Sequence, residues 1–164
     1  MNEDEKKFAE IVLKRLCKGT QVDGIRFGPT LQILLSPCAI APDSIKGQVY
    51  LNLSDRWTVF ETRPDNFPKN ENDLLEVSTE DEIQRIVALR ERVIINVELG
   101  TSEPHLILTL NDGRVLFVNG KHGLYESWDM GVAYGSEKEL WQVIACPGGG
   151  IAIWTPSTFD NTST

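Results

Sequence analysis

Three glycines behind a proline, in the stretch ACPGGGIAIW (residues 145–154), are the most distinctive candidate for chemistry in this sequence. A phosphate-binding loop needs a Gly-Lys-Ser/Thr ending that opens a helix, so that backbone amides and the lysine meet the phosphates. No lysine follows here, the residues after the glycines have a strand pattern, and the dinucleotide-binding spacing is absent. The stretch therefore predicts a turn at residues 147–150 between antiparallel strands, with a close backbone approach to another surface as the alternative.

A second candidate is LYESWDMG, residues 124–131. If residues 124–128 form a strand, Glu126 lies on the same face as Leu124 and Trp128. A carboxylate against an aromatic wall can act as a general acid, but catalysis usually needs a partner acid, base or nucleophile. A backbone hydrogen bond or a pair with Arg114 is the structural alternative. The ligand site predicted as the alternative to a partner surface consists of Tyr125, Glu126, Trp128, Gly148 and Gly149.

Histidines and cysteines form no recognisable metal or nucleophile pattern. His105 and His122 have no cysteine or carboxylate at zinc-ligand spacing. The three cysteines are far apart, without a CxxC pair, which is typical of free thiols in a reducing compartment. For Cys146 an inert buried thiol is favoured over a nucleophile activated by a histidine. We expect no catalytic residue, no metal, no cofactor and no enzymatic activity.

The charge balance points to the class of partner. Acidic residues outnumber basic ones by 24 to 16, which gives a net charge of −8. This disfavours nucleic acid and anionic membranes and favours a basic protein, although acidity can also serve solubility alone. No signal-peptide pattern or long apolar run is present, so we expect a cytoplasmic protein.

The linker and second helix carry the acidic residues predicted to form the partner surface. The alternative for them is a solvated loop with ordinary helix capping. These residues are Asp65, Glu71, Asp73, Glu76, Glu80, Asp81 and Glu82.

Hydrophobic spacing predicts two helices. The first covers residues 4–17, ends before Gly19, and has a stripe of Phe8, Ile11, Val12 and Leu16. The second lies within STEDEIQRIVALRER, residues 78–92, and begins at a Ser78 or Thr79 cap. Its predicted buried stripe is Ile83, Ile86, Val87 and Leu89.

Strand patterns occupy residues 30–36, 48–54, 57–62, 92–99, 105–110, 114–118, 124–128, 140–146 and 151–154. The Asp112-Gly113 step is the strongest hairpin signal. Two series of segments match each other in order. The first is LKRL, a strand, TLQILL, GQVYLNL and VFET, and the second is IVAL, a strand, HLILTL, GRVLFV and LYES. We therefore predict an α+β domain over residues 1–156, a mainly antiparallel sheet with two helices on one face. Its pseudo-repeated helix-plus-meander halves cover about 4–62 and 78–154, residues 62–77 form a linking loop, and residues 157–164 form a flexible tail.

The second half resembles a family of small bacterial domains of unknown function. They combine a hairpin of the form L-x-L-x-x-x-D-G-x-x-L-x-V with an aromatic-Glu-x-Trp and a late Pro-Gly-Gly, matched over roughly residues 93–154. The matching residues are Asp112, Gly113, Leu116, Val118, Tyr125, Glu126, Trp128, Pro147, Gly148 and Gly149. Small acidic domains of this kind look like immunity proteins of bacterial toxin systems.

That resemblance implies a non-enzymatic protein that neutralises a cognate toxin by occluding a basic surface. The alternative is a small-molecule-binding or hydrolytic domain that uses Glu126 near the turn at residues 147–150. A subunit of a larger assembly is a third interpretation, which differs from the first in stoichiometry and permanence.

Overall fold

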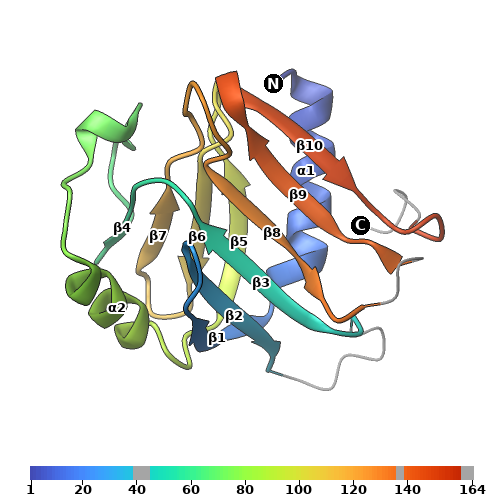
Figure 1. Cartoon of the computed structure of the whole chain (residues 1–164), viewed down its shortest axis with the longest axis horizontal. Helices are drawn as coiled ribbons and strands as arrows, with labels where there is room; N and C mark the ends of the chain where they lie inside the picture. The colour runs from blue at the N-terminus through green and yellow to red at the C-terminus, as the bar shows by residue number, and fades with distance from the viewer. Residues whose placement is uncertain (39–44, 136–138, 160–164) are drawn as a thin grey trace.

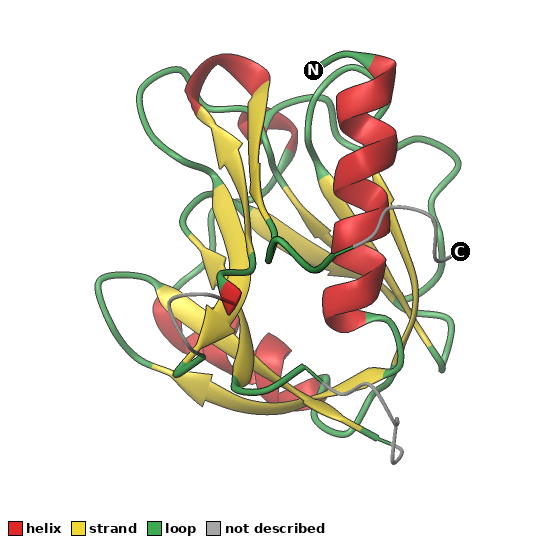
Figure 2. Ribbon diagram, turned by 90° about the vertical axis from the view of Figure 1, so that its right-hand side faces the viewer, coloured by secondary structure: helices red, strands yellow, loops and turns green. Residues whose placement is uncertain are grey.

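Two antiparallel sheets and two α-helices make up the described part of the computed structural model, residues 1–38, 45–135 and 139–159 (Figures 1 and 2). The six-stranded sheet has the order β1 (Thr20–Arg26), β2 (Leu31–Pro37), β3 (Gln48–Leu53), β8 (Trp128–Ala133), β9 (Gln142–Cys146), β10 (Gly150–Trp154). The four-stranded sheet has the order β4 (Trp57–Phe60), β7 (Val115–Val118), β6 (Leu106–Leu110), β5 (Ile94–Leu99). The predicted α+β class is confirmed, but the strands form two sheets rather than one.

Helix α1 (Glu3–Cys17) joins the two sheets (Figure 2). A capping box starts it: the Asn2 side chain accepts the Glu5 N–H, and the Glu5 carboxylate accepts the Asn2 N–H, both at 2.8 Å. The helix contacts β5 of one sheet and β9 and β10 of the other. Its buried residues are Ala9, Val12, Leu13, Leu16 and Cys17. This helix therefore covers the core that lies between the sheets. No helix among the described residues is long and apolar enough to cross a membrane.

Helix α2 (Thr79–Ala88) lies at the side of the molecule, near β4 and β7 in Figure 1. Ser78 caps it as predicted, because its hydroxyl accepts the Asp81 N–H at 3.2 Å. Ile86 and Leu89 are buried, but Val87 is exposed. The prediction that Val87 belongs to the buried stripe is wrong, because the position after Ile86 is rotated by about 100° and α2 buries only a narrow stripe.

The two halves of the chain exchange their fourth strands. In the first half β1, β2 and β3 form a meander, and in the second half β5, β6 and β7 do the same. However, β4 pairs with β7, with Trp57 opposite Val118, and β8 pairs with β3, with Trp128 opposite Leu53. Each half thus completes the sheet of the other. The duplication itself stays a prediction.

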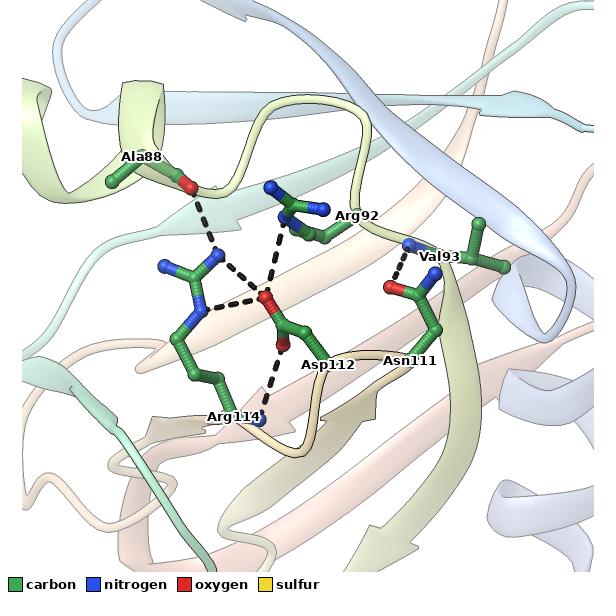
Figure 3. A network of polar contacts seen from close by, with 6 residues as sticks. All are labelled: Ala88, Arg92, Val93, Asn111, Asp112 and Arg114. Carbon is green, nitrogen blue, oxygen red and sulfur yellow. Dashed lines mark hydrogen bonds and ion pairs between the residues drawn. The ribbon is translucent and has the colours of Figure 1, made fainter.

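The Asp112-Gly113 hairpin forms as predicted between β6 and β7, with Gly113 at φ 91°. Figure 3 shows how its turn is anchored. The Asp112 carboxylate accepts hydrogen bonds from the Arg114 guanidinium at 2.7 and 2.9 Å and pairs with Arg92 at 3.2 Å. Arg114 also donates to the Ala88 carbonyl at 3.0 Å, so the turn is held against the end of α2.

Residues 124–127 are not part of a strand, contrary to the prediction. The imidazole Nδ1 of His122 accepts the N–H groups of Leu124 and Tyr125 at 3.1 and 3.3 Å, so the chain turns here. As a result Leu124 is exposed, whereas Trp128 is fully buried at the start of β8. The alternating faces expected for Leu124, Glu126 and Trp128 do not exist.

The linker of residues 62–77 packs against the four-stranded sheet. Phe67 stacks on Phe117 of β7, with ring centroids 5.6 Å apart and an interplanar angle of 13°. Leu74 is buried in the same small cluster with Ile107, Val115 and Phe117. The linker is therefore a loop with a core of its own, and this packing fixes the positions of its acidic residues.

Candidate functional site

A cleft of about 570 Å³ lies where the linker, α2 and two turns of the sheets meet. Its walls come from the β1–β2 hairpin loop, the turn between β3 and β4, the segment 71–77, the first turn of α2 and Tyr125. Four carboxylates line it, those of Asp55, Glu71, Glu76 and Glu82. Arg56 is the one cationic side chain among the described lining residues.

The Arg56 guanidinium binds partners in the wall of the cleft. Its guanidinium donates to the carbonyls of Glu71 and Leu74, both at 3.3 Å, and pairs with Glu76 at 3.3 Å. Arg56 therefore holds the linker against the β3–β4 turn. One arginine cannot neutralise four carboxylates, so the cleft stays acidic.

Asp55 is held in place at the cleft by three donors. Its Oδ1 accepts the Arg56 N–H at 2.6 Å, and its Oδ2 accepts Asn119 Nδ2 at 2.8 Å and Ser127 Oγ at 3.4 Å. Asn119 and Ser127 are fully buried. No ion pair of Asp55 is present within the described ranges. These three hydrogen bonds fix the orientation of the Asp55 carboxylate at the cleft.

The pKa values of two groups that line the cleft, Tyr125 and Glu82, are raised. Burial, and then the carboxylates of Asp55 and Glu71, raise the pKa of the Tyr125 phenol. Burial also raises the pKa of Glu82, while a hydrogen bond from Trp57 and the charge of Arg85 oppose this shift. The carboxylates of the cleft thus act on the Tyr125 phenol, whereas burial alone raises the pKa of Glu82.

Exposed apolar side chains border the same cleft. Phe27 is 65% exposed, Leu75 is 83% exposed and Tyr125 is 49% exposed. All three line the cleft, from the β1–β2 loop, the linker and the loop before β8. Exposed apolar groups beside a concave charged surface are typical of protein interaction sites.

The structure brings together three of the seven acidic residues predicted for the partner surface. Glu71, Glu76 and Glu82 line the cleft. The others lie elsewhere. Asp65 lines a separate cavity beside His105, Asp73 accepts the Lys69 N–H at 2.8 Å, and Glu80 and Asp81 are exposed in the first turn of α2.

Sequence reasoning missed Asp55, Phe27 and Leu75. Asp55 stands in an ordinary turn sequence, LSDRW, and its two side-chain donors come from residues 64 and 72 positions away. The exposure of Phe27 and Leu75 follows from packing, and no local pattern indicates it.

The residues of the alternative ligand site do not converge. Tyr125 lines the acidic cleft, and Glu126 is exposed. Trp128 is fully buried and donates its indole N–H to the Pro104 carbonyl at 2.8 Å. Arg114, weighed as a partner of Glu126, is bound to Asp112 instead.

The glycine stretch turns the chain between β9 and β10, as predicted. Gly148 and Gly149 have φ angles of 78° and 84°, which favour glycine. A Cβ on Gly149 would lie 2.2 Å from Glu103 Oε2, and Glu103 itself pairs with Lys121 at 2.5 Å. The close approach that the extra glycine permits is thus to the loop before β6.

We expect Gly149→Ala to cost more stability than Gly148→Ala. Both substitutions place alanine at a positive φ, which costs about 1 kcal/mol. Only Gly149→Ala must also displace Glu103, because nothing lies within 4 Å of a Cβ on Gly148. Urea denaturation of the two variants measures the difference. Equal losses would contradict the contact with Glu103.

The thiols and histidines are not arranged for nucleophilic catalysis. Burial raises the pKa of Cys17, Cys38 and Cys146, and Glu126 adds to the shift at Cys146. Thiols with raised pKa values are poor nucleophiles at neutral pH. His105 is buried, and its Nδ1 accepts the Gly120 N–H at 3.0 Å. Within the described ranges no group of three or more His, Cys, Asp or Glu is placed to hold a metal ion.

No protein-family model matches the chain. Neither a curated protein nor a solved structure matches it. The resemblance to immunity proteins therefore stays a prediction.

Burial lowers the pKa of His105 from its ordinary value of 6.5, against the opposing effects of its hydrogen bond to the Lys69 carbonyl and of Glu103. The unfolded chain therefore binds the proton first as pH falls below about 6.5. We expect the free energy of unfolding to be at its full value above that pH. It should decrease on acidification until the folded histidine is protonated too, by at most about 1.4 kcal/mol per pH unit.

Chemical denaturation at a series of pH values measures this slope. His105→Asn should reduce it. A slope that survives unchanged in His105→Asn would contradict the assignment.

Proposed function

We propose that this chain is a non-enzymatic binding protein whose acidic cleft takes up a basic segment of a partner protein. The observation that carries this proposal is the coincidence of four carboxylates with the exposed side chains of Phe27, Leu75 and Tyr125 in one cleft. A partner that presents arginine or lysine beside apolar side chains is complementary to both parts of that surface.

The partner we propose is a basic toxin, as for an immunity protein. The net charge of −8 supports attraction of a basic protein over distance, and the cleft supports its specific capture. Occlusion of a basic toxin surface needs no catalytic group in this chain. The three free cysteines support a cytoplasmic location for this role.

Charge reversal inside and outside the cleft tests the proposal. The cleft variant is Glu71→Lys with Glu76→Lys, and the control is Glu61→Lys with Glu80→Lys, which changes the net charge by the same amount. An arginine-rich peptide that carries one tryptophan serves as the probe, in calorimetric titrations at low and moderate salt. We expect the cleft variant to weaken binding about tenfold or more and the control by less than about threefold.

Equal weakening by the two variants would mean that only net charge attracts the peptide, and would overturn the cleft as the binding site. Unchanged binding in the cleft variant would overturn it as well. The same two variants then apply to the protein that co-purifies with the tagged chain at low salt from its own host.

A further inference from the structure

A chain of hydrogen bonds connects the buried side chain of His105 to the acidic cleft. Nδ1 of His105 accepts the Gly120 N–H at 3.0 Å. The preceding residue, Asn119, donates from Nδ2 to Asp55 Oδ2 at 2.8 Å and to the Lys121 carbonyl at 3.0 Å. The turn 119–121 therefore lies between the histidine and the carboxylate of the cleft.

Asn119 transmits any movement of this turn. Its side chain is fully buried, and its Oδ1 has no hydrogen-bond partner within the described ranges. Both hydrogen bonds of the amide thus run through Nδ2, and a displacement of the turn alters the one that leaves the turn, to Asp55. Asp55 would then lose the shorter of its two side-chain donors.

The hydrogen bond from Gly120 requires the neutral form of His105. Nδ1 must be unprotonated to accept the Gly120 N–H. A second proton would place two N–H groups against each other and break the bond to Gly120. Packing on Phe117, with ring centroids 5.3 Å apart, leaves the imidazole little room to turn.

Charged groups surround His105 from several elements. Glu103 on its own loop and Asp55 favour its protonation, and Lys121 opposes it, while burial as the largest influence lowers its pKa. The other charged side chains that line the same cavity come from α1, the linker and β5: Lys6, Glu10, Arg63, Asp65, Lys69 and Glu98. Their charges are balanced, so burial determines the direction.

We propose that His105 and Asn119 are positioning residues for the Asp55 carboxylate, and that protonation of His105 disorders the turn 119–121 and weakens cation binding in the cleft. The part about binding rests on the proposed function. The positioning itself does not, because it is a property of the free protein. The cleft would thus hold a basic segment at neutral pH and release it on acidification.

Amide NMR signals of the full chain test the positioning without any ligand. Between pH 8 and 5 we expect the Gly120 backbone amide and the Asn119 side-chain amide to shift with the midpoint of the His105 ring signals. His105→Asn keeps an acceptor near the position of Nδ1 but does not titrate, so both shifts should disappear in it. His122→Asn is the matched control and should retain them, although His122 stacks on Tyr125 of the cleft.

Binding of a hexa-arginine peptide at pH 7.5 and 5.5 tests the consequence. We expect the affinity of the unmodified chain to fall about three- to tenfold on acidification, and that of His105→Asn to change by less than about twofold. An Asn119 side-chain signal that does not follow His105 in the unmodified chain would overturn the proposal, and this result needs no variant. Peptide binding at neither pH would contradict the proposed function, while the amide signals would still decide the positioning.

Discussion

Trp128→Ala should lower the free energy of unfolding by about 3–5 kcal/mol, among the largest losses available to a single substitution in this chain. Trp128 is fully buried in the main core, at the start of the strand that joins the second half to β3. Its truncation leaves a large cavity and removes the hydrogen bond to the Pro104 carbonyl. Equilibrium denaturation followed by far-ultraviolet circular dichroism measures the loss.

Trp154→Ala is the control for this prediction, because Trp154 lies at the end of β10 and is 43% exposed. We expect its cost to stay below about 1 kcal/mol. If the two tryptophans cost the same small amount, Trp128 is not a core residue, and its place in a ligand site with Glu126 would have to be considered again.

Gly120→Ala should be at least as damaging, with a loss of about 3 kcal/mol or more. A Cβ at this position would lie 1.9 Å from the Pro104 carbonyl oxygen and 2.6 Å from the His105 nitrogen. Both are backbone atoms, so no side-chain rotation relieves the overlap, and the loop before β6 must move. The same movement would break the hydrogen bond from Gly120 to His105.

Gly123→Ala provides the control within the same connection. Nothing lies within 4 Å of a Cβ there, and Gly123 has no left-handed φ. We expect a change within about 0.5 kcal/mol, measured by thermal unfolding of both variants. A similar melting temperature for the two variants would contradict the close packing of residues 119–121 on Pro104.

The sequence predicted those helices and turns that interactions between neighbouring residues determine. The span of α1 follows from a repeating apolar stripe and the stop before Gly19, and the β6–β7 hairpin follows from Asp112-Gly113. Residues 124–127 have the composition of a strand, but the N–H groups of Leu124 and Tyr125 bond to His122 and not to a neighbouring strand. Strand propensities consider only the residues of the segment itself, so they do not take the His122 side chain into account.

The cleft was only partly predictable, for the same reason. Glu71, Glu76 and Glu82 belong to the acidic run seen in the sequence, yet Asp73 and Glu80 belong to it equally and lie outside the cleft. Packing of the linker on Phe117 and the contacts of Arg56 determine which carboxylates face inward. Such long-range contacts leave no pattern in a single sequence.

The exchange of fourth strands also constrains how the chain is made. After β3 leaves the ribosome, its free edge has no partner until β8 has been synthesised, roughly 4–16 s later at rates of about 5–20 residues per second. During that interval β3 presents unpaired backbone groups beside Val49, Leu51 and Leu53, which are buried once β8 docks. We therefore expect the sheet to stay open at the edge of β3 during synthesis until β8 has emerged.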